Sequence, residues 1–300
     1  MLAASPLFHH IPREQVSDRI PVLPQYVFPK QAMTTFAGFV ANGRWGRVTT
    51  GIIRWFVGHY GVNMEEAANP DIGSYATFNE FFTRALGPGA RPLADADFIC
   101  PVDGAISQFG AIDDDRIIQA KNHNYSTAAL VGGDRDLAAR FQHGSFATLY
   151  LSPKDYHRVH MPCAGKLTRM IFVPGTLFSV NPVTARGVPE LFARNERAVC
   201  VFDTEHGPFV LVLVGATIVG SMETVWHGVI NPPGTRDVRE WHYQPGDWVF
   251  EKGDEMGRFS LGSTIVMLFP KERLVFNPEW APEREVRLGE AMAVVRESAR

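Results

Sequence analysis

An acid, two imidazoles and a hydroxyl stand in sequence contexts that could support nucleophilic chemistry. Asp103 lies in a tight Pro-Val-Asp-Gly turn, and His157 and His160 lie three residues apart between two prolines. Ser263 follows Gly262 at the start of an apolar run that predicts a buried strand. In the chain order Asp, His, Ser, these residues form the set that is needed to activate a serine.

The setting of Ser263 differs from that of the serine in a hydrolase. No Gly-x-Ser-x-Gly sequence surrounds it, and it lies close to the C-terminus. Gly262 can hold backbone conformations that are closed to other residues, and it leaves its own carbonyl unshielded. A hydroxyl beside such a carbonyl can attack its own chain instead of an external substrate.

Each of these motifs alone has an ordinary structural interpretation. Asp103 could cap its own turn, and a Gly-Ser-Thr turn is common before a strand. His157 and His160 have a spacing that metal ligands can have. Because the sequence offers no convincing third ligand, we predict no metal site.

The segments around these residues predict an α+β protein with a mainly antiparallel β sandwich or barrel core. Short helices are expected at 127–131 and 134–142, and Glu205-His206-Gly207 predicts a hairpin turn. Strands are expected at 146–151, 166–173, 198–203, 209–214, 217–219, 225–230, 248–251 and 265–269.

The N-terminal part has a different pattern. Helices are expected from Pro29 to a stop at Gly43, from 48 to 59, and after a capping box formed by Thr77 and Glu80. Glycine and proline at 87–89 and 91–92 then break the chain. We therefore predict an N-terminal helical region at residues 1–90 and a β-rich catalytic domain at residues 91–300.

Charge in the N-terminal region is entirely positive over a long stretch. Between Arg19 and Met64 there is no acidic residue, whereas basic residues and many aromatic residues alternate along the predicted helices. Amphipathic helices of this composition suit an anionic membrane surface. Packing of the same helices on the core is the alternative.

Overall composition limits the other functional classes. The net charge of −3 gives the chain no general attraction to nucleic acid, so we predict no nucleic-acid partner. Three widely spaced cysteines predict neither a disulfide framework nor a structural zinc site, and they favour a reducing cytosol. We find no secretion signal and no run that is long enough to span a membrane.

Six motifs stand in order along the chain, at Pro101–Gly104, Asp155–Pro162, Pro174–Asn181, Phe192–Arg197, Gly215–Ser221 and Gly257–Thr264. Together they resemble the motifs of bacterial phosphatidylserine decarboxylases, which are membrane-associated and depend on a pyruvoyl group. The resemblance extends from about Pro24 to Phe269 and leaves out the tail beyond Pro270.

The resemblance implies self-cleavage between Gly262 and Ser263. Asp103 would orient His160, and His160 would take the proton from Ser263 Oγ as that oxygen attacks the Gly262 carbonyl. Elimination from the resulting ester would leave a 1–262 β chain and a 263–300 α chain. Ser263 would become a covalent pyruvoyl group at the new N-terminus.

The same resemblance implies the reaction and its location. Phosphatidylserine would form a Schiff base with the pyruvoyl carbonyl, lose CO₂ and become phosphatidylethanolamine, with His157 as the proton donor. No standard side chain offers the required carbonyl. The implied partners are an anionic membrane and the two cleaved chains as a heterodimer, which could dimerise further. The implied location is peripheral, on the cytoplasmic face of the bacterial inner membrane.

Three alternatives remain open at this stage. A pyruvoyl decarboxylase could act on a soluble amino acid, although the basic aromatic region argues against this. A serine hydrolase could use Asp103, His160 and Ser263 on an external ester. A non-enzymatic membrane-binding protein would use all three residues as turn formers.

Overall fold

The computed structural model describes most of the chain. The described residues are 22, 24–27, 30–120, 123–217, 221–230, 236–260, 262–271 and 274–296. Most of the strand expected at 217–219, and the expected helix start at Pro29, lie outside these ranges.

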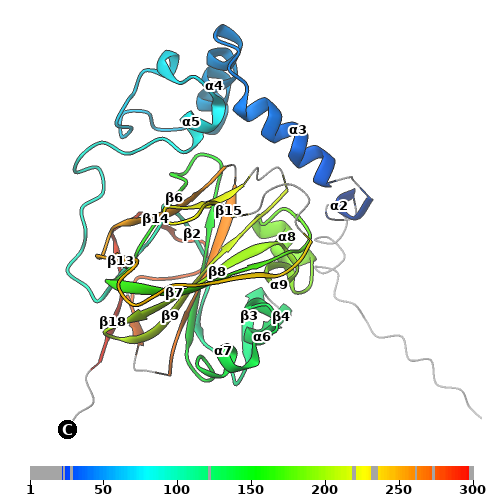
Figure 1. Cartoon of the computed structure of the whole chain (residues 1–300). Helices are drawn as coiled ribbons and strands as arrows, with labels where there is room; N and C mark the ends of the chain where they lie inside the picture. Colours follow the sequence, from blue (N-terminus) through cyan, green and yellow to red (C-terminus); the bar gives the residue numbers. More distant parts are fainter. Residues whose placement is uncertain are drawn as a thin grey trace, which may run out of the picture.

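A nine-stranded antiparallel sheet forms the body of the molecule (Figure 1). Its order is β12-β7-β8-β9-β15-β5-β2-β17, and β13 pairs with β7 as a ninth strand. The strands are β2 (Gly104–Ala111), β5 (Ser145–Leu151), β7 (Gly165–Val173), β8 (Arg197–Thr204), β9 (Gly207–Val214), β12 (Arg239–His242), β13 (Val249–Phe250), β15 (Ser263–Phe269) and β17 (Glu285–Val286).

Strand β15 lies in the middle of this sheet, between β5 and β9. All seven of its residues are buried. Because successive side chains of a strand point to opposite faces, full burial means that both faces of the sheet are covered here. The apolar sequence that follows Ser263 is therefore explained by its central position.

Three smaller sheets surround the body. One of them has four strands in the order β11-β10-β14-β6, and its strand β6 ends at His160. Its strands are β6 (Arg158–His160), β10 (Met222–Thr224), β11 (Gly228–Val229) and β14 (Glu255–Phe259). The other strands are β1 (Phe98–Ile99), β16 (Leu274–Phe276) and β18 (Ala291–Val295) in one sheet, and β3 (Arg116–Ala120) and β4 (His123–Ser126) in another.

Helices in the body are short. They gather on the right-hand side of the sheet in the view of Figure 1, together with β3 and β4. They are α6 (Thr127–Leu130), α7 (Arg135–Ala139), α8 (Pro182–Gly187) and α9 (Leu191–Arg194). The N-terminal caps of α6, α7 and α8 are side-chain oxygens of Ser126, Asp134 and Asn181.

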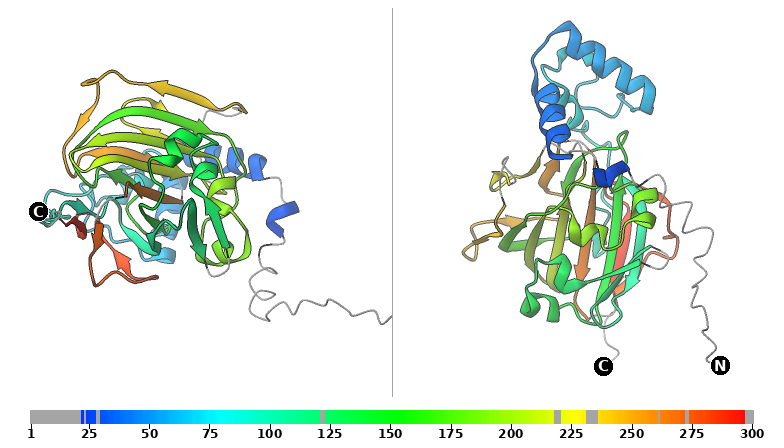
Figure 2. Two further views of the ribbon diagram at one scale, coloured as in Figure 1. Left: turned by 90° about the horizontal axis from the view of Figure 1, so that it is seen from below. Right: turned by 90° about the vertical axis from the view of Figure 1, so that its right-hand side faces the viewer.

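Most of the N-terminal helices form a separate layer at one end of the sheet (Figures 1 and 2). They are α3 (Lys30–Asn42), α4 (Arg47–Tyr60), the 3-10 helix η2 (Ile72–Ser74) and α5 (Phe78–Phe82). The short helix α2 (Pro24–Val27) lies against the body, where the Tyr26 ring is 5.0 Å from the Phe178 ring. A small apolar cluster holds α4 to α5, in which the Phe56 ring lies 5.0 Å from the Phe78 ring and 5.9 Å from the Phe81 ring. None of the helices in the described ranges has the length and apolar content needed to cross a bilayer.

The expected fold class is confirmed, with differences in detail. The helix expected at 134–142 ends earlier, at Ala139. Within the described residues the large sheet is open, because its end strands β12 and β17 do not pair with each other. The strand expected at 225–230 is wrong in its first half, where residues 225–227 form a turn. The hairpin at Glu205-His206-Gly207 is confirmed: β8 pairs with β9, and Gly207 has a φ of 93°.

Candidate functional site

Ser263 begins β15 and is paired with Leu151, the last residue of β5. Its side chain is fully buried, and its Oγ has no hydrogen-bond partner among the residues that the structure describes. Gly262 has a φ of 52°, in the left-handed region that glycine adopts more readily than other residues. A buried hydroxyl without a partner is costly, and such groups often have a chemical role.

His157 lies on the loop that connects β5 to β6, and it is fully buried. Its Nδ1 lies 2.8 Å from the carbonyl oxygen of Asp155. Since a carbonyl only accepts, Nδ1 carries the proton and Nε2 keeps its lone pair. Nε2 has no partner within the described part of the chain, and the Phe82 ring packs against the imidazole at 4.0 Å. Burial lowers the pKa of His157 to about 3, so the ring is neutral at pH 7.

His160, at the end of β6, has both ring nitrogens occupied. Nδ1 lies 2.7 Å from the carbonyl oxygen of Gly253, and Nε2 lies 3.0 Å from the Tyr156 hydroxyl. The Gly253 carbonyl again requires the proton on Nδ1, so Nε2 accepts from Tyr156. Burial lowers the pKa of His160, and it raises the pKa of Tyr156, which keeps the phenol protonated as a donor.

Asp103 lies just before β2 and is bound by an arginine. Arg91 Nε is 2.9 Å from Oδ1 and Arg91 Nη2 is 2.5 Å from Oδ2, and the backbone N–H of Leu288 also donates to Oδ1 at 2.9 Å. The hydrogen bond to Asp103 raises the pKa of Arg91. Arg91 also reaches Glu66 in the N-terminal region at 2.7 Å.

The structure brings the expected residues to one end of the sheet but does not connect all of them. Phe259, four residues before Ser263, donates its N–H to the His157 carbonyl oxygen at 3.0 Å. The His160 N–H donates to Pro101, two residues before Asp103, at 2.9 Å. In this conformation Asp103 is hydrogen-bonded to Arg91 and Leu288, and the His160 ring is hydrogen-bonded to Gly253 and Tyr156, so no direct Asp103–His160 bond is seen.

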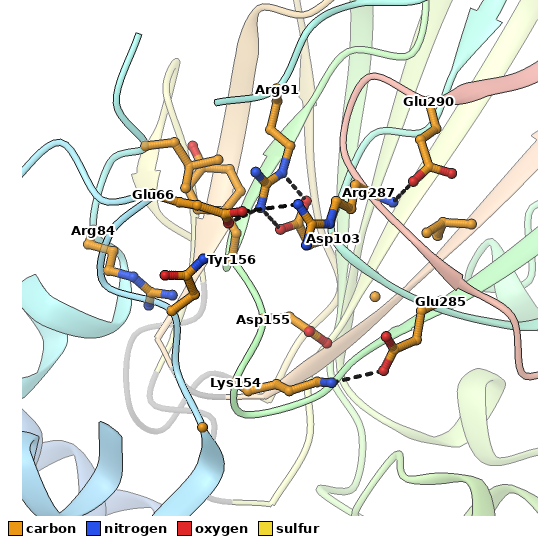
Figure 3. A pocket seen from close by; sticks show the side chains of 15 residues that line it. Glu66, Arg84, Arg91, Asp103, Lys154, Asp155, Tyr156, Glu285, Arg287 and Glu290 are labelled. Atoms are coloured by element: carbon orange, nitrogen blue, oxygen red, sulfur yellow. Dashed lines mark hydrogen bonds and ion pairs between the residues drawn. The ribbon is translucent and has the colours of Figure 1, made fainter. Parts of the chain in front are cut away.

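A cavity of about 370 Å³ opens beside Asp103 and Tyr156, whereas Ser263, His157 and His160 are not among the residues that line it (Figure 3). Its wall combines the N-terminal region, the Asp103 turn, the loop before His157 and the C-terminal tail. The charged residues that line it are Glu66, Arg84, Arg91, Asp103, Lys154, Asp155, Glu285, Arg287 and Glu290.

Several of these residues carried no signal in the sequence. Arg91 was interpreted only as part of a chain break, and Glu66 and Arg287 lie in segments without a recognisable motif. Arg287 Nη1 lies 3.0 Å from Glu66, although 221 residues separate them. Tyr156 could have been found, because it stands inside the histidine motif, four residues before His160.

The described residues contain no group of three His, Cys, Asp or Glu side chains that could hold a metal ion. His157 and His160 instead direct their Nδ1 atoms at backbone carbonyls. Both imidazoles therefore carry their proton on Nδ1 and have an unprotonated Nε2.

A buried serine after a left-handed glycine, with neutral imidazoles on the neighbouring segment, fits the class of proteins that process their own chain. Comparison with known proteins agrees with this class. The family model described as phosphatidylserine decarboxylase matches residues 78–294, and a second model, described as PSD, matches residues 20–61.

Curated relatives are similar over nearly their whole length. The phosphatidylserine decarboxylase proenzyme of Variovorax paradoxus is 72% identical over 93% of this chain and 98% of its own. The proenzymes of Herminiimonas arsenicoxydans and Azoarcus sp. (strain BH72) are 70% and 69% identical, over 93% and 92% of this chain and 95% and 96% of their own. The chain belongs to the phosphatidylserine decarboxylase family.

Proposed function

We propose that this chain is a proenzyme that cleaves itself between Gly262 and Ser263 and then decarboxylates phosphatidylserine to phosphatidylethanolamine. The observation that carries the proposal is the fully buried, unpartnered Oγ of Ser263 directly after a glycine with positive φ. The curated relatives named above are proenzymes, a term that fits a chain activated by cleavage.

In the cleavage step, His160 is the proposed base for Ser263 Oγ. Its neutral tautomer has the lone pair on Nε2, as a base requires. To act, Nε2 exchanges the Tyr156 hydroxyl for the serine hydroxyl. Asp103 is the proposed orienting acid. While it is bound to Arg91, it acts on His160 indirectly, through its negative charge and through the backbone hydrogen bond from His160 to Pro101. A direct hydrogen bond to the His160 ring would require Asp103 to leave Arg91.

After cleavage the two pieces would stay together as an α/β heterodimer. β15 begins at Ser263 and keeps its ladders to β5 and β9, which belong to the larger piece. The tail adds further pairs, between β17 and β2 and between β18 and β1. Assembly beyond this pair is not part of the proposal.

Ser263 would supply the pyruvoyl cofactor, whose carbonyl holds the substrate amine and accepts the electron pair that CO₂ leaves behind. His157 is the proposed proton donor. Because its pKa is lowered to about 3 by burial, it must first take up a proton at Nε2 before it can donate one. The substrate ammonium, which must lose a proton before its amine can react, would supply that proton.

The N-terminal layer is the proposed membrane contact. Phe36 and Phe39 on α3 are each 69% exposed, and Trp55 on α4 is 61% exposed. Arg44, Arg47 and Arg54 are exposed on the same two-helix region. Exposed aromatic residues with adjacent basic residues suit an anionic bilayer surface, so we place the protein peripherally, at the cytoplasmic face of the bacterial inner membrane.

Intact mass and CO₂ release test the proposal together. Purified protein should contain two chains corresponding to 1–262 and 263–300, the smaller with a ketone at its N-terminus. It should release CO₂ from phosphatidylserine in vesicles. A single 300-residue chain that is active, or two chains that release no CO₂, would contradict it.

A further inference from the structure

Arg84 is a buried cation that forms no ion pair with any residue in the described ranges. It lies two residues after the end of α5, is only 6% exposed, and lines the cavity beside Asp103. Figure 3 shows its side chain reaching toward the cavity. Its Nε has no hydrogen bond, and no carboxylate among the described residues forms an ion pair with it. Burial lowers its pKa, although the nearby charges of Asp103 and Glu66 act in the opposite direction.

The other cations of the cavity are neutralised by neighbouring acids. Arg91 binds Asp103 and Glu66, and Arg287 binds Glu66 as well. The lining as a whole holds four cations and five carboxylates, so Arg84 is distinguished by its lack of a direct ion pair and not by an excess of positive charge. Lys154 is paired separately with a glutamate, at 2.8 Å. Arg84 is therefore the cation that remains available to a ligand with one negative charge.

Arg84 also lies next to the histidine segment. Phe82, two residues earlier, packs on the His157 ring, and the carbonyl oxygen of Thr83 accepts a hydrogen bond from Arg158 Nε at 2.8 Å. Gly104 of the cavity wall lies on β2, two strands from Ser263 on β15. At about 4.8 Å per strand, the separation is about 10 Å. The headgroup, from its amine through the phosphodiester to the glycerol, is long enough to extend from residue 263 to this wall of the cavity.

We propose that Arg84 binds the phosphodiester of the lipid substrate, with the headgroup lying in this cavity. The substrate carries two negative groups, but only the phosphodiester keeps its charge throughout the reaction. A buried guanidinium on the carboxylate would stabilise the substrate relative to the transition state, because that charge disappears as CO₂ leaves. The phosphodiester contact lowers KM without opposing the chemistry. This inference rests on the proposed function.

Arg84→Gln tests the inference with a water-soluble competitor. Glycerophosphoserine carries the phosphodiester and the serine group but no acyl chains, and it is added to a CO₂-release assay on phosphatidylserine micelles. Its inhibition constant should rise about 10- to 100-fold in Arg84→Gln, the effect of a lost charged hydrogen bond. KM should rise while kcat is largely kept, and Arg84→Lys should recover part of the loss. An unchanged inhibition constant, or a fall in kcat alone, overturns the proposal.

Two smaller ligands show which part of the headgroup Arg84 contacts. Free serine lacks the phosphate, so its inhibition should be the same in Arg84→Gln and in the unmodified protein. Inorganic phosphate should inhibit far less than glycerophosphoserine, and equal potency of the two would overturn the headgroup assignment in favour of a free-phosphate site. As a matched control, Arg140→Gln removes one exposed positive charge outside the cavity lining and should leave the inhibition constant of glycerophosphoserine unchanged.

Processing provides the control for folding. The cleaved fraction on a denaturing gel reports whether Arg84→Gln and Arg84→Lys fold, because self-cleavage uses no phosphate. If the unmodified protein neither cleaves nor releases CO₂, the proposed function itself fails. If the unmodified protein is active but Arg84→Gln binds glycerophosphoserine normally, only the inference about Arg84 fails.

Discussion

Arg91 and Asp103 form a two-point ion pair, with Nε 2.9 Å from Oδ1 and Nη2 2.5 Å from Oδ2. Both side chains are largely buried, at 7% and 11% exposure. The pair joins the chain break after the helical region to the turn that carries the proposed orienting acid. Arg91 also binds Glu66 of the N-terminal region, and Asp103 also accepts from Leu288 of the C-terminal tail, so the pair connects these two parts of the chain.

Arg91→Ala should destabilise the precursor by about 3–5 kcal/mol, because it leaves a buried carboxylate unpaired. Self-cleavage should slow as well. Urea unfolding in an uncleavable background measures the first effect, and a timed gel measures the second. Arg140→Ala is the control: its ion pair with Asp203 is exposed and should be worth at most about 1 kcal/mol. An equal loss of unfolding free energy in both variants would show that the Arg91–Asp103 pair stabilises the precursor no more than an exposed ion pair does.

Ser263→Ala should give one uncleaved 300-residue chain and no CO₂ release, because the attacking oxygen is gone. Ser263→Cys should cleave at least partly, since a thiol can make the same acyl shift. The matched control is Ser260→Ala on the same segment, which should still cleave, because the Oγ of Ser260 is bound to the Oγ of Ser221 at 3.1 Å. Cleavage of Ser263→Ala into two bands would reassign the nucleophile.

The two histidines should separate by role. His160→Ala should block cleavage, whereas His157→Ala should cleave but release CO₂ about 10²–10⁴-fold more slowly, the usual contribution of general acid catalysis. A gel and a CO₂ assay on both variants decide this. If cleaved His157→Ala released CO₂ at the full rate, the role of His157 would be structural only, for example through its packing on Phe82.

Stability should fall with acid partly because of His157. Its folded-state pKa of about 3 lies below the unfolded value of 6.5, so below pH 6.5 the unfolded chain takes up a proton that the folded chain does not. The contribution of His157 to the free energy of unfolding is therefore complete above pH 6.5 and is lost as the pH falls toward 3. Between these limits the loss is up to about 1.4 kcal/mol per pH unit. In the Ser263→Ala background, His157→Gln should therefore flatten the dependence of the unfolding free energy on pH. Parallel curves for the two proteins would argue against a buried, neutral His157.

Vesicle binding should depend on the N-terminal helices. Removal of residues 1–60 should weaken binding to anionic vesicles, and so should added salt, which screens charges over about 8–10 Å. Each basic residue contributes at most about 1 kcal/mol. Phe36→Ser with Phe39→Ser should weaken binding without loss of self-cleavage, whereas Ile118→Ser, at a 48% exposed apolar residue on β3, should not. Equal binding by all variants would make α3 and α4 ordinary packing helices.

Local sequence patterns determined much of the fold and the identity of the site. The apolar run after Ser263 correctly predicted β15, and the turn residues at 205–207 placed a hairpin. Thr77 caps α5 as expected by accepting from the Glu80 N–H, although the Glu80 side chain accepts from Ala76 and not from Thr77. These features depend on neighbouring residues, so periodicity and turn chemistry reveal them. Six local motifs were likewise enough to indicate the family, and the comparisons confirm it. The division at residue 90 and the individual site roles remain predictions.

Only the tertiary structure decided which groups face one another. Leu288 donates to Asp103 across 185 residues of sequence, and Arg287 reaches Glu66 across 221. The same packing buries Arg84 without an ion-pair partner among the described residues, and it gives the His160 ring Gly253 and Tyr156 as partners. Such contacts depend on how the sheets and the helical layer pack, and no local pattern encodes that. The identities of the reacting groups could therefore be found in the sequence, whereas their charges, tautomers and partners follow from the fold.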